Sequence, residues 1–198
     1  IGAVAANLGE MEVAVFNTSY RIMWITLILI NALSSASGIK MSMRLGKLNH
    51  IGAKQAGHAG LALCFITLCV VSLLVLWQAR TLGAIFTNDE EFLQLFDECR
   101  VPFTVVLFLM NLSIAIEKIP YSMGRTSDVF WMGVIASWGF QVPGVFVCTT
   151  YWRNDLNGLY SGMAIGYFAL CILYGIIAFS SDWEKYAQLA RSRSEASE

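Results

Sequence analysis

Long apolar runs without a charged residue dominate this sequence, and the run from Leu61 to Ala79 is a clear example. A hydrocarbon core about 30 Å thick is crossed by an α-helix of about 20 apolar residues, which is the length of these runs. Only 14% of the residues are charged, whereas soluble domains carry about 25%, and the charges collect between the runs. Because a charge at the bilayer centre costs on the order of 3 kcal/mol, this segregation predicts an integral membrane protein.

The positions of the runs predict six membrane spans. The first is truncated and covers residues 1–8, and five full-length spans follow at residues 13–38, 60–79, 101–121, 129–151 and 159–179. Spanning strands would alternate in polarity, and the run from Ile66 to Val71 does not. The expected fold class is therefore an all-α polytopic membrane protein, with a six-helix lobe at residues 1–180.

The sequence also predicts the character of the two ends of the chain. The sequence begins at Ile1 inside an apolar run that lacks a charged n-region, so we expect no signal peptide and a fragment whose first helix is incomplete. Residues 181–198 mix charged residues with serine and alanine, which predicts a cytoplasmic tail that forms a helical turn or two before it frays.

Lysine and arginine residues predict the orientation, because cytoplasmic loops carry more of them than loops on the other side. If the loop after the 13–38 span is cytoplasmic, nine basic residues lie on that side and four on the other, and the C-terminus is cytoplasmic. The nine are Lys40, Arg44, Lys47, Lys54, Lys118, Arg125, Lys185, Arg191 and Arg193, and the four are Arg21, Arg80, Arg100 and Arg153.

Polar residues inside the spans are the candidates for a functional site, since each needs a polar neighbour or a water-filled cavity. The residues that we expect to face a substrate or ion cavity are Asn31, Asn111, Glu117, Gln141 and Tyr167. The stripe that holds Asn31, Ser34 and Ser35 also suits close helix packing through small residues. A tyrosine ladder around Tyr167 suits either the binding of an organic cation or interfacial anchoring.

Glu117 is the only acidic residue well inside a predicted span, and two interpretations of it stay open. It is either a proton or cation site, or an interfacial carboxylate that pairs with Lys118 or Arg125. Pro120 follows one turn later and is expected to kink the helix, because proline donates no backbone hydrogen bond. Pro143 is expected to kink the next span beside Gln141.

Other classes of protein fit the sequence less well. Five cysteines are scattered without metal-ligand spacing, so we expect no metal site and no cofactor. His50 and His58 lie in a loop region, and no hydrolase motif occurs, so we do not expect an enzyme. Rings of acidic residues and filter-like glycine repeats, which are typical of channels, do not occur either. The net charge of -1 gives no reason to expect a nucleic-acid partner.

Six segments, taken in order, resemble the second six-helix repeat of the multidrug and toxic compound extrusion (MATE) family over nearly the whole chain. The most specific match is LGAIFTNDEEFLQL (82–95), which resembles the family's segment before its tenth helix. The others are NLGEMEVAVFN (7–17), MRLGKLNHIGAKQA (43–56), SMGRTSDVF (122–130), QVPGVF (141–146) and NGLYSGMAIG (157–166).

This resemblance implies half of a twelve-helix antiporter that exports organic compounds, often cations, in exchange for H⁺ or Na⁺. Transport by alternating access needs both halves. The implied partners are the lipid bilayer, a small organic substrate and the missing N-terminal lobe, and the implied location is the plasma membrane or a vacuolar or other organelle membrane. Related alternatives are a flippase, an exporter of metabolites or organic anions, and a membrane subunit that does not transport.

Individual residues both match and depart from the family pattern. Arg44 and Gly46 match the basic loop and Arg125 matches a Gly-Arg turn, which implies positions at a cytoplasmic gate. The alternative for the two arginines is plain anchoring of the chain on the cytoplasmic side of the membrane. The carboxylate that many members carry in the tenth helix aligns with Met110 or Asn111, neither of which titrates. An anionic or neutral cargo therefore stays open.

Overall fold

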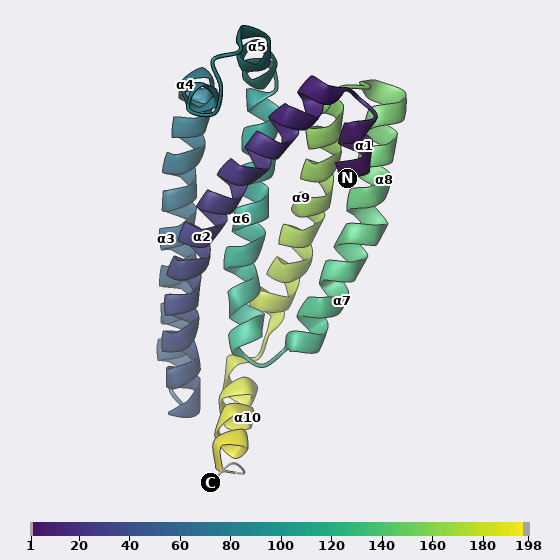
Figure 1. The fold of residues 1–198 in the computed structure, drawn as a ribbon. Helices are drawn as coiled ribbons and strands as arrows, with labels where there is room; N and C mark the ends of the chain where they lie inside the picture. The colour runs from purple at the N-terminus through teal and green to yellow at the C-terminus, as the bar shows by residue number, and fades with distance from the viewer. Residues whose placement is uncertain (1, 196–198) are drawn as a thin grey trace.

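The structure, a computed structural model, describes residues 2–195, without the side chains of residue 3 and residues 193–195. The described residues form helices and no strand, which confirms the predicted all-α class. Five helical segments are long and apolar enough to cross a membrane: Glu10–Gly46 (α2), His50–Trp77 (α3), Arg100–Ser122 (α6), Thr126–Trp152 and Leu156–Ser180 (α9). They run as a bundle between two ends (Figure 1).

Short helices lie at the two ends of the bundle. Helices α4 (Ala79–Ala84) and α5 (Glu90–Glu98) lie at one end and α10 (Trp183–Glu195) lies at the other (Figure 1). Near the N-terminus, the region predicted as a truncated span forms only the short helix α1 (Gly2–Ala6), which contacts α2 and α9, and Ile1 lies outside the described residues.

Side-chain caps fix where several helices begin. Asn49 Oδ1 accepts a hydrogen bond of 2.8 Å from the Gly52 amide at the start of α3. Asp89 and Asp155 cap α5 and α9 in the same way, at 3.0 Å and 2.9 Å. Such caps satisfy amides that have no partner within the helix, so these loops end where the sequence supplies Asn or Asp.

The fourth membrane-crossing segment is not a regular α-helix. It consists of α7 (Thr126–Ala136), the π-helical turn η1 (Ser137–Gln141), α8 (Val142–Val147) and the π-helical turn η2 (Cys148–Trp152). Pro143 lies within the first two residues of α8, so η1 absorbs the change that a proline imposes on the helix before it.

Helix α6 is the central helix and packs against α2, α3 and α9. Aromatic rings connect these helices. The ring centroid of Phe103 on α6 lies 5.9 Å from that of Tyr160 on α9, and the Tyr160 centroid lies 6.3 Å from that of Phe16 on α2. Helix α8 approaches α9 so closely that a Cβ on Gly162 would lie 2.6 Å from the Val145 nitrogen. Close backbone packing of this kind is typical of membrane helices. The hydrophobic effect does not drive helices together within lipid, so their association depends on van der Waals packing, which small residues allow.

Helix α10 is longer than the one or two turns predicted for the tail. Its apolar face packs on the end of the bundle through the buried Ala187 and the partly buried Trp183, Tyr186 and Ala190. The Trp183 ring lies against Gly57 of α3, 3.5 Å from the position of an added Cβ. The tail is therefore a helix stabilised by tertiary contacts. Its many charged residues gave no indication of these contacts in the sequence.

Candidate functional site

Asn111 lies in the interior of the lobe and does not reach an exposed face. Its side chain is fully buried, and its Nδ2 donates a hydrogen bond of 2.8 Å to the Leu107 carbonyl one turn earlier. Its Oδ1 has no hydrogen-bond partner among the described residues. A buried carbonyl oxygen without a hydrogen-bond partner costs free energy of folding. Asn111 therefore holds an unsatisfied acceptor in the interior of the bundle.

Gln141 and Tyr167 are brought together by the structure. Gln141 ends η1, Tyr167 lies on α9, and their side chains interact, with Tyr20 of α2 nearby. Gly166 makes this approach possible, because an added Cβ would lie 2.7 Å from the Gln141 Cα. The Gln141 Nε2 is buried and makes no hydrogen bond of good geometry with any described residue. Three helices thus meet at a small polar cluster that we name the tyrosine–glutamine cluster: Tyr20, Gln141 and Tyr167.

Asn31 and Glu117 do not join this cluster. Asn31 is exposed on α2, where its Oδ1 accepts a 3.5 Å hydrogen bond from Ser35. Glu117 is half-buried on α6, within electrostatic reach of Lys118 and Tyr174. Among the described residues no ion pair includes Glu117, so the pairing with Lys118 or Arg125, which was one of the two interpretations, is not formed.

The two candidate gate arginines make structural contacts at the α10 end of the bundle. Arg44 donates from Nη1 to the Gly52 carbonyl at 2.6 Å, which closes the loop between α2 and α3 beside Gly46, the last residue of α2. Pro120 lies inside α6, which ends two residues later at Ser122. The Pro120 carbonyl accepts a hydrogen bond of 3.0 Å from the Arg125 amide in the turn that follows, where Gly124 has a φ of 81°.

The Arg125 side chain joins four parts of the lobe. It forms an ion pair of 2.6 Å with Asp128 of α7 and donates to the Ser181 hydroxyl at 2.8 Å, and its Nη1 lies 3.5 Å from the Ile177 carbonyl. It also lies 5.6 Å from the Tyr186 ring of α10. We name these residues the Arg125 junction.

A polar stripe lies on the exposed face of α2, and Asn31 is its only member that was predicted from the sequence as a site residue. The exposed residues on this face are Asn17, Tyr20, Arg21, Trp24, Ile28 and Asn31, while the opposite face of α2 is buried. Their spacing of three, four and seven residues places them on one side of a helix. That periodicity is visible in the sequence, but Arg21 was used there only in the count of basic residues that predicted the orientation in the membrane.

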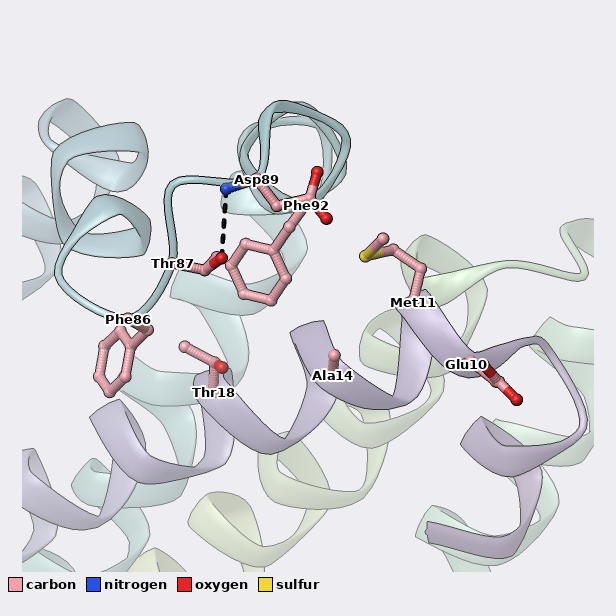
Figure 2. A pocket seen from close by; sticks show the side chains of 8 residues that line it. All are labelled: Glu10, Met11, Ala14, Thr18, Phe86, Thr87, Asp89 and Phe92. Atoms are coloured by element: carbon pink, nitrogen blue, oxygen red, sulfur yellow. Dashed lines mark hydrogen bonds between the residues drawn. The ribbon is translucent and has the colours of Figure 1, made fainter.

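A pocket of about 390 Å³ lies where the first turns of α2 meet the loop between α4 and α5 (Figure 2). Phe86, Thr87 and Phe92 line it opposite Met11 and Thr18. Figure 2 shows the Glu10 carboxylate pointing away from Asp89, and the Asp89 carboxylate caps α5. The pocket therefore lacks charged groups that converge on one point, and it is not the best candidate for a binding site.

Comparison with known proteins identifies relatives of the whole lobe. Arabidopsis thaliana Protein DETOXIFICATION 14 is 20% identical over 162 residues, which cover 82% of this chain and 33% of that protein. Protein DETOXIFICATION 8 from the same plant is 22% identical over 193 residues, which cover 93% of this chain and 38% of that protein. The chain thus spans about a third of the length of these curated relatives.

The fold itself has been seen before. The crystal structure of the eukaryotic MATE transporter AtDTX14 superimposes with a TM-score of 0.87 at 18% sequence identity, over 93% of this chain and 41% of that one. The family model named MatE matches residues 1–147, which is most of the chain. The family is one of transporters and not of enzymes, as the sequence led us to expect. The chain therefore belongs to the MATE family of membrane transporters.

Proposed function

We propose that this chain is the C-terminal lobe of a secondary active exporter that exchanges an organic compound for H⁺ or Na⁺. The polar stripe on α2 carries the proposal, because a lipid-facing helix does not keep an exposed, unpaired arginine and two exposed asparagines on one face. Such a face is suited to a water-filled cavity between this lobe and a second, N-terminal lobe. The lipid bilayer covers the apolar faces of α3 and of α7.

The proposed orientation places α10 and the basic loops in the cytoplasm. Lys40, Arg44 and Lys47 lie around the turn between α2 and α3, at the same end of the bundle as α10 (Figure 1). Positive charge is enriched on the cytoplasmic side of membrane proteins. The tyrosine–glutamine cluster then lies within the membrane-crossing region, where residues of α2, η1 and α9 come together.

The test is solute flux driven by an ion gradient, measured with the full-length protein in liposomes of defined lipid. Under the proposal, an imposed proton or sodium gradient accumulates an organic solute against its own gradient, and an ionophore that dissipates the gradient abolishes the accumulation. Empty liposomes and liposomes with protein but no gradient are the controls. If a panel of anionic, neutral and cationic solutes shows no gradient-driven flux, the proposed function fails.

A further inference from the structure

Arg21 differs from the other arginines whose side chains the structure describes. Each of the others has a hydrogen bond, an ion pair or another contact: Arg44, Arg80, Arg100, Arg125, Arg153 and Arg191. Arg21 is exposed, and no hydrogen bond or ion pair to a described residue involves it. A guanidinium offers five N–H donors in a planar fork, so Arg21 presents this fork to whatever covers the exposed face of α2.

The depth of Arg21 in the helix places it at or within the edge of the hydrocarbon. Residues 22–39 contain no charge, and they extend about 27 Å along α2 at about 1.5 Å per residue before Lys40 is reached. Helix α2 crosses the bundle obliquely (Figure 1), so this stretch covers less than its full length across the membrane. An arginine at that depth needs an anionic partner or water.

Arg21 has no anionic partner among the described residues. The nearest acidic residues along α2, Glu12 and Glu10, lie nine and eleven residues before it. Asn17, one turn before Arg21, is neutral, and its side chain both donates and accepts hydrogen bonds. An unpaired guanidinium beside neutral polar groups favours a ligand that supplies negatively charged acceptors.

The same face offers flat apolar surface beside the charge. The Tyr20 side chain is 41% exposed and the Trp24 side chain is 51% exposed, one turn further along α2. Aromatic side chains stack on planar rings, and they are otherwise placed at a membrane surface by their amphipathic character. Charge and ring surface in one turn of the helix match a ligand that carries a negative group on an aromatic ring.

We propose that this transporter carries aromatic organic anions, and that Arg21 holds their carboxylate, sulfonate or phosphate group while Tyr20 and Trp24 contact the ring. The proposal rests on the proposed transport function and narrows its substrate class. Exposed cationic side chains at this depth also bind lipid phosphates, so the experiment distinguishes a transported anion from a lipid headgroup.

The experiment compares two fluorescent probes of similar size in liposomes that contain the full-length protein. Carboxyfluorescein is the aromatic anion and ethidium is the aromatic cation. We expect gradient-driven flux of carboxyfluorescein to exceed that of ethidium. Arg21→Gln is expected to raise the KM for carboxyfluorescein about tenfold or more, because a charge-assisted pair of hydrogen bonds is lost. Arg80→Gln is the matched control, since Arg80 forms an exposed ion pair with Glu90 outside the stripe.

Arg21→Lys separates the ligand from the lipid. A lysine keeps its charge at the headgroup and still reaches a lipid phosphate, but it lacks the fork that binds two oxygens. Under the proposal, Arg21→Lys raises the KM for the anion as Arg21→Gln does, and the shift is the same in neutral and anionic lipid. If Arg21→Lys behaves as the unsubstituted protein does, or if the shift follows the lipid charge, Arg21 binds lipid and the proposal is overturned.

Two further outcomes keep this inference distinct from the proposed function. Gradient-driven flux of ethidium without flux of carboxyfluorescein supports an exporter and overturns the anion assignment. Absence of flux for both probes overturns the anion assignment, and the wider panel of solutes then decides whether the chain belongs to an exporter. Equal anion KM values for Arg21→Gln and Arg80→Gln, with equal amounts of folded protein, also overturn the role of Arg21.

Discussion

Arg125 donates from Nη1 to the Ser181 hydroxyl at 2.8 Å, and this bond ties the turn after α6 to the segment that connects α9 with α10. The two residues are 56 positions apart, so the bond fixes the relative placement of helices that are distant in sequence. The Arg125 junction therefore sets the geometry at one end of the lobe.

Arg125→Ala is expected to destabilise the protein. The substitution leaves Asp128 without its cation and removes the donor to Ser181 from a site where the Arg125 side chain is only 21% exposed. The loss of such charge-assisted bonds costs about 1–3 kcal/mol. A thermal-shift measurement on the purified full-length protein should show a clearly lower Tm.

Arg80→Ala is the matched control for that measurement. Both side chains of the Arg80–Glu90 pair are 59% exposed, and exposed pairs contribute about 0–1 kcal/mol. Equal Tm shifts for the two variants would contradict a stabilising role for the Arg125 junction.

Gly162→Ala is expected to prevent normal packing of α8 on α9. The added Cβ would lie 2.6 Å from the Val145 nitrogen and 2.8 Å from the Gly144 carbonyl carbon, and both are backbone atoms that cannot rotate away. The yield of monodisperse protein in size-exclusion chromatography should fall strongly. Gly175→Ala on the same helix meets no atom within 4 Å and should keep or slightly raise the yield, since alanine favours helices.

Gln141→Leu and Tyr167→Phe are expected to lower transport without lowering the amount of folded protein. Each removes polar atoms from the tyrosine–glutamine cluster and keeps the Cβ that packs beside Gly166 or within α9. We expect about a tenfold loss of turnover, which corresponds to about 1.4 kcal/mol. Flux per folded molecule is the measurement.

Tyr121→Phe is the control for the cluster, because Tyr121 is an exposed tyrosine near the C-terminal end of α6 and does not belong to the cluster. Loss of flux in Tyr121→Phe equal to that in Tyr167→Phe would mean that the cluster has no special role.

Cys99 is expected to resist alkylation in the folded protein. It is fully buried between α5 and α6, and burial raises the pKa of its thiol to about 12, with the carboxylates of Glu98 and Asp155 acting in the same direction. A raised thiol pKa keeps the unreactive protonated form, so the labelling rate stays low up to pH 9. Mass spectrometry after N-ethylmaleimide treatment should find Cys99 modified only once the protein is unfolded in detergent. Rapid labelling of Cys99 at pH 8 in the folded protein would refute its burial.

Much of the fold was predictable because each helix that crosses the lipid needs about 20 consecutive apolar residues. The runs at 101–121 and 159–179 lie inside α6 and α9, whose ends extend only a few residues further. Helix α2 runs well beyond residues 13–38, since Glu10, Lys40 and Arg44 remain helical outside the apolar part. The predicted span at 60–79 passes the true end of α3 at Trp77, because hydropathy does not detect the break at Gln78.

Other features depend on contacts that a single sequence does not reveal. The helix α10 is stabilised by Trp183 and Ala187 against the bundle, and its charged residues hide this from a hydropathy argument. The meeting of Gln141 with Tyr167 depends on how η1 approaches α9 at Gly166. Asn111 was expected to face a cavity, but helical spacing alone does not distinguish the face of α6 that is covered by its neighbours.

The glycine contact between α8 and α9 has a mechanical consequence. Two helices that touch through main-chain atoms at Gly144 and Gly162 have little side-chain volume at that point to absorb displacement. When one of these helices tilts, the other is therefore expected to tilt with it, so that the pair moves as a rigid body. Probe pairs placed on α8 and α9 should keep a constant separation while the rest of the transporter moves.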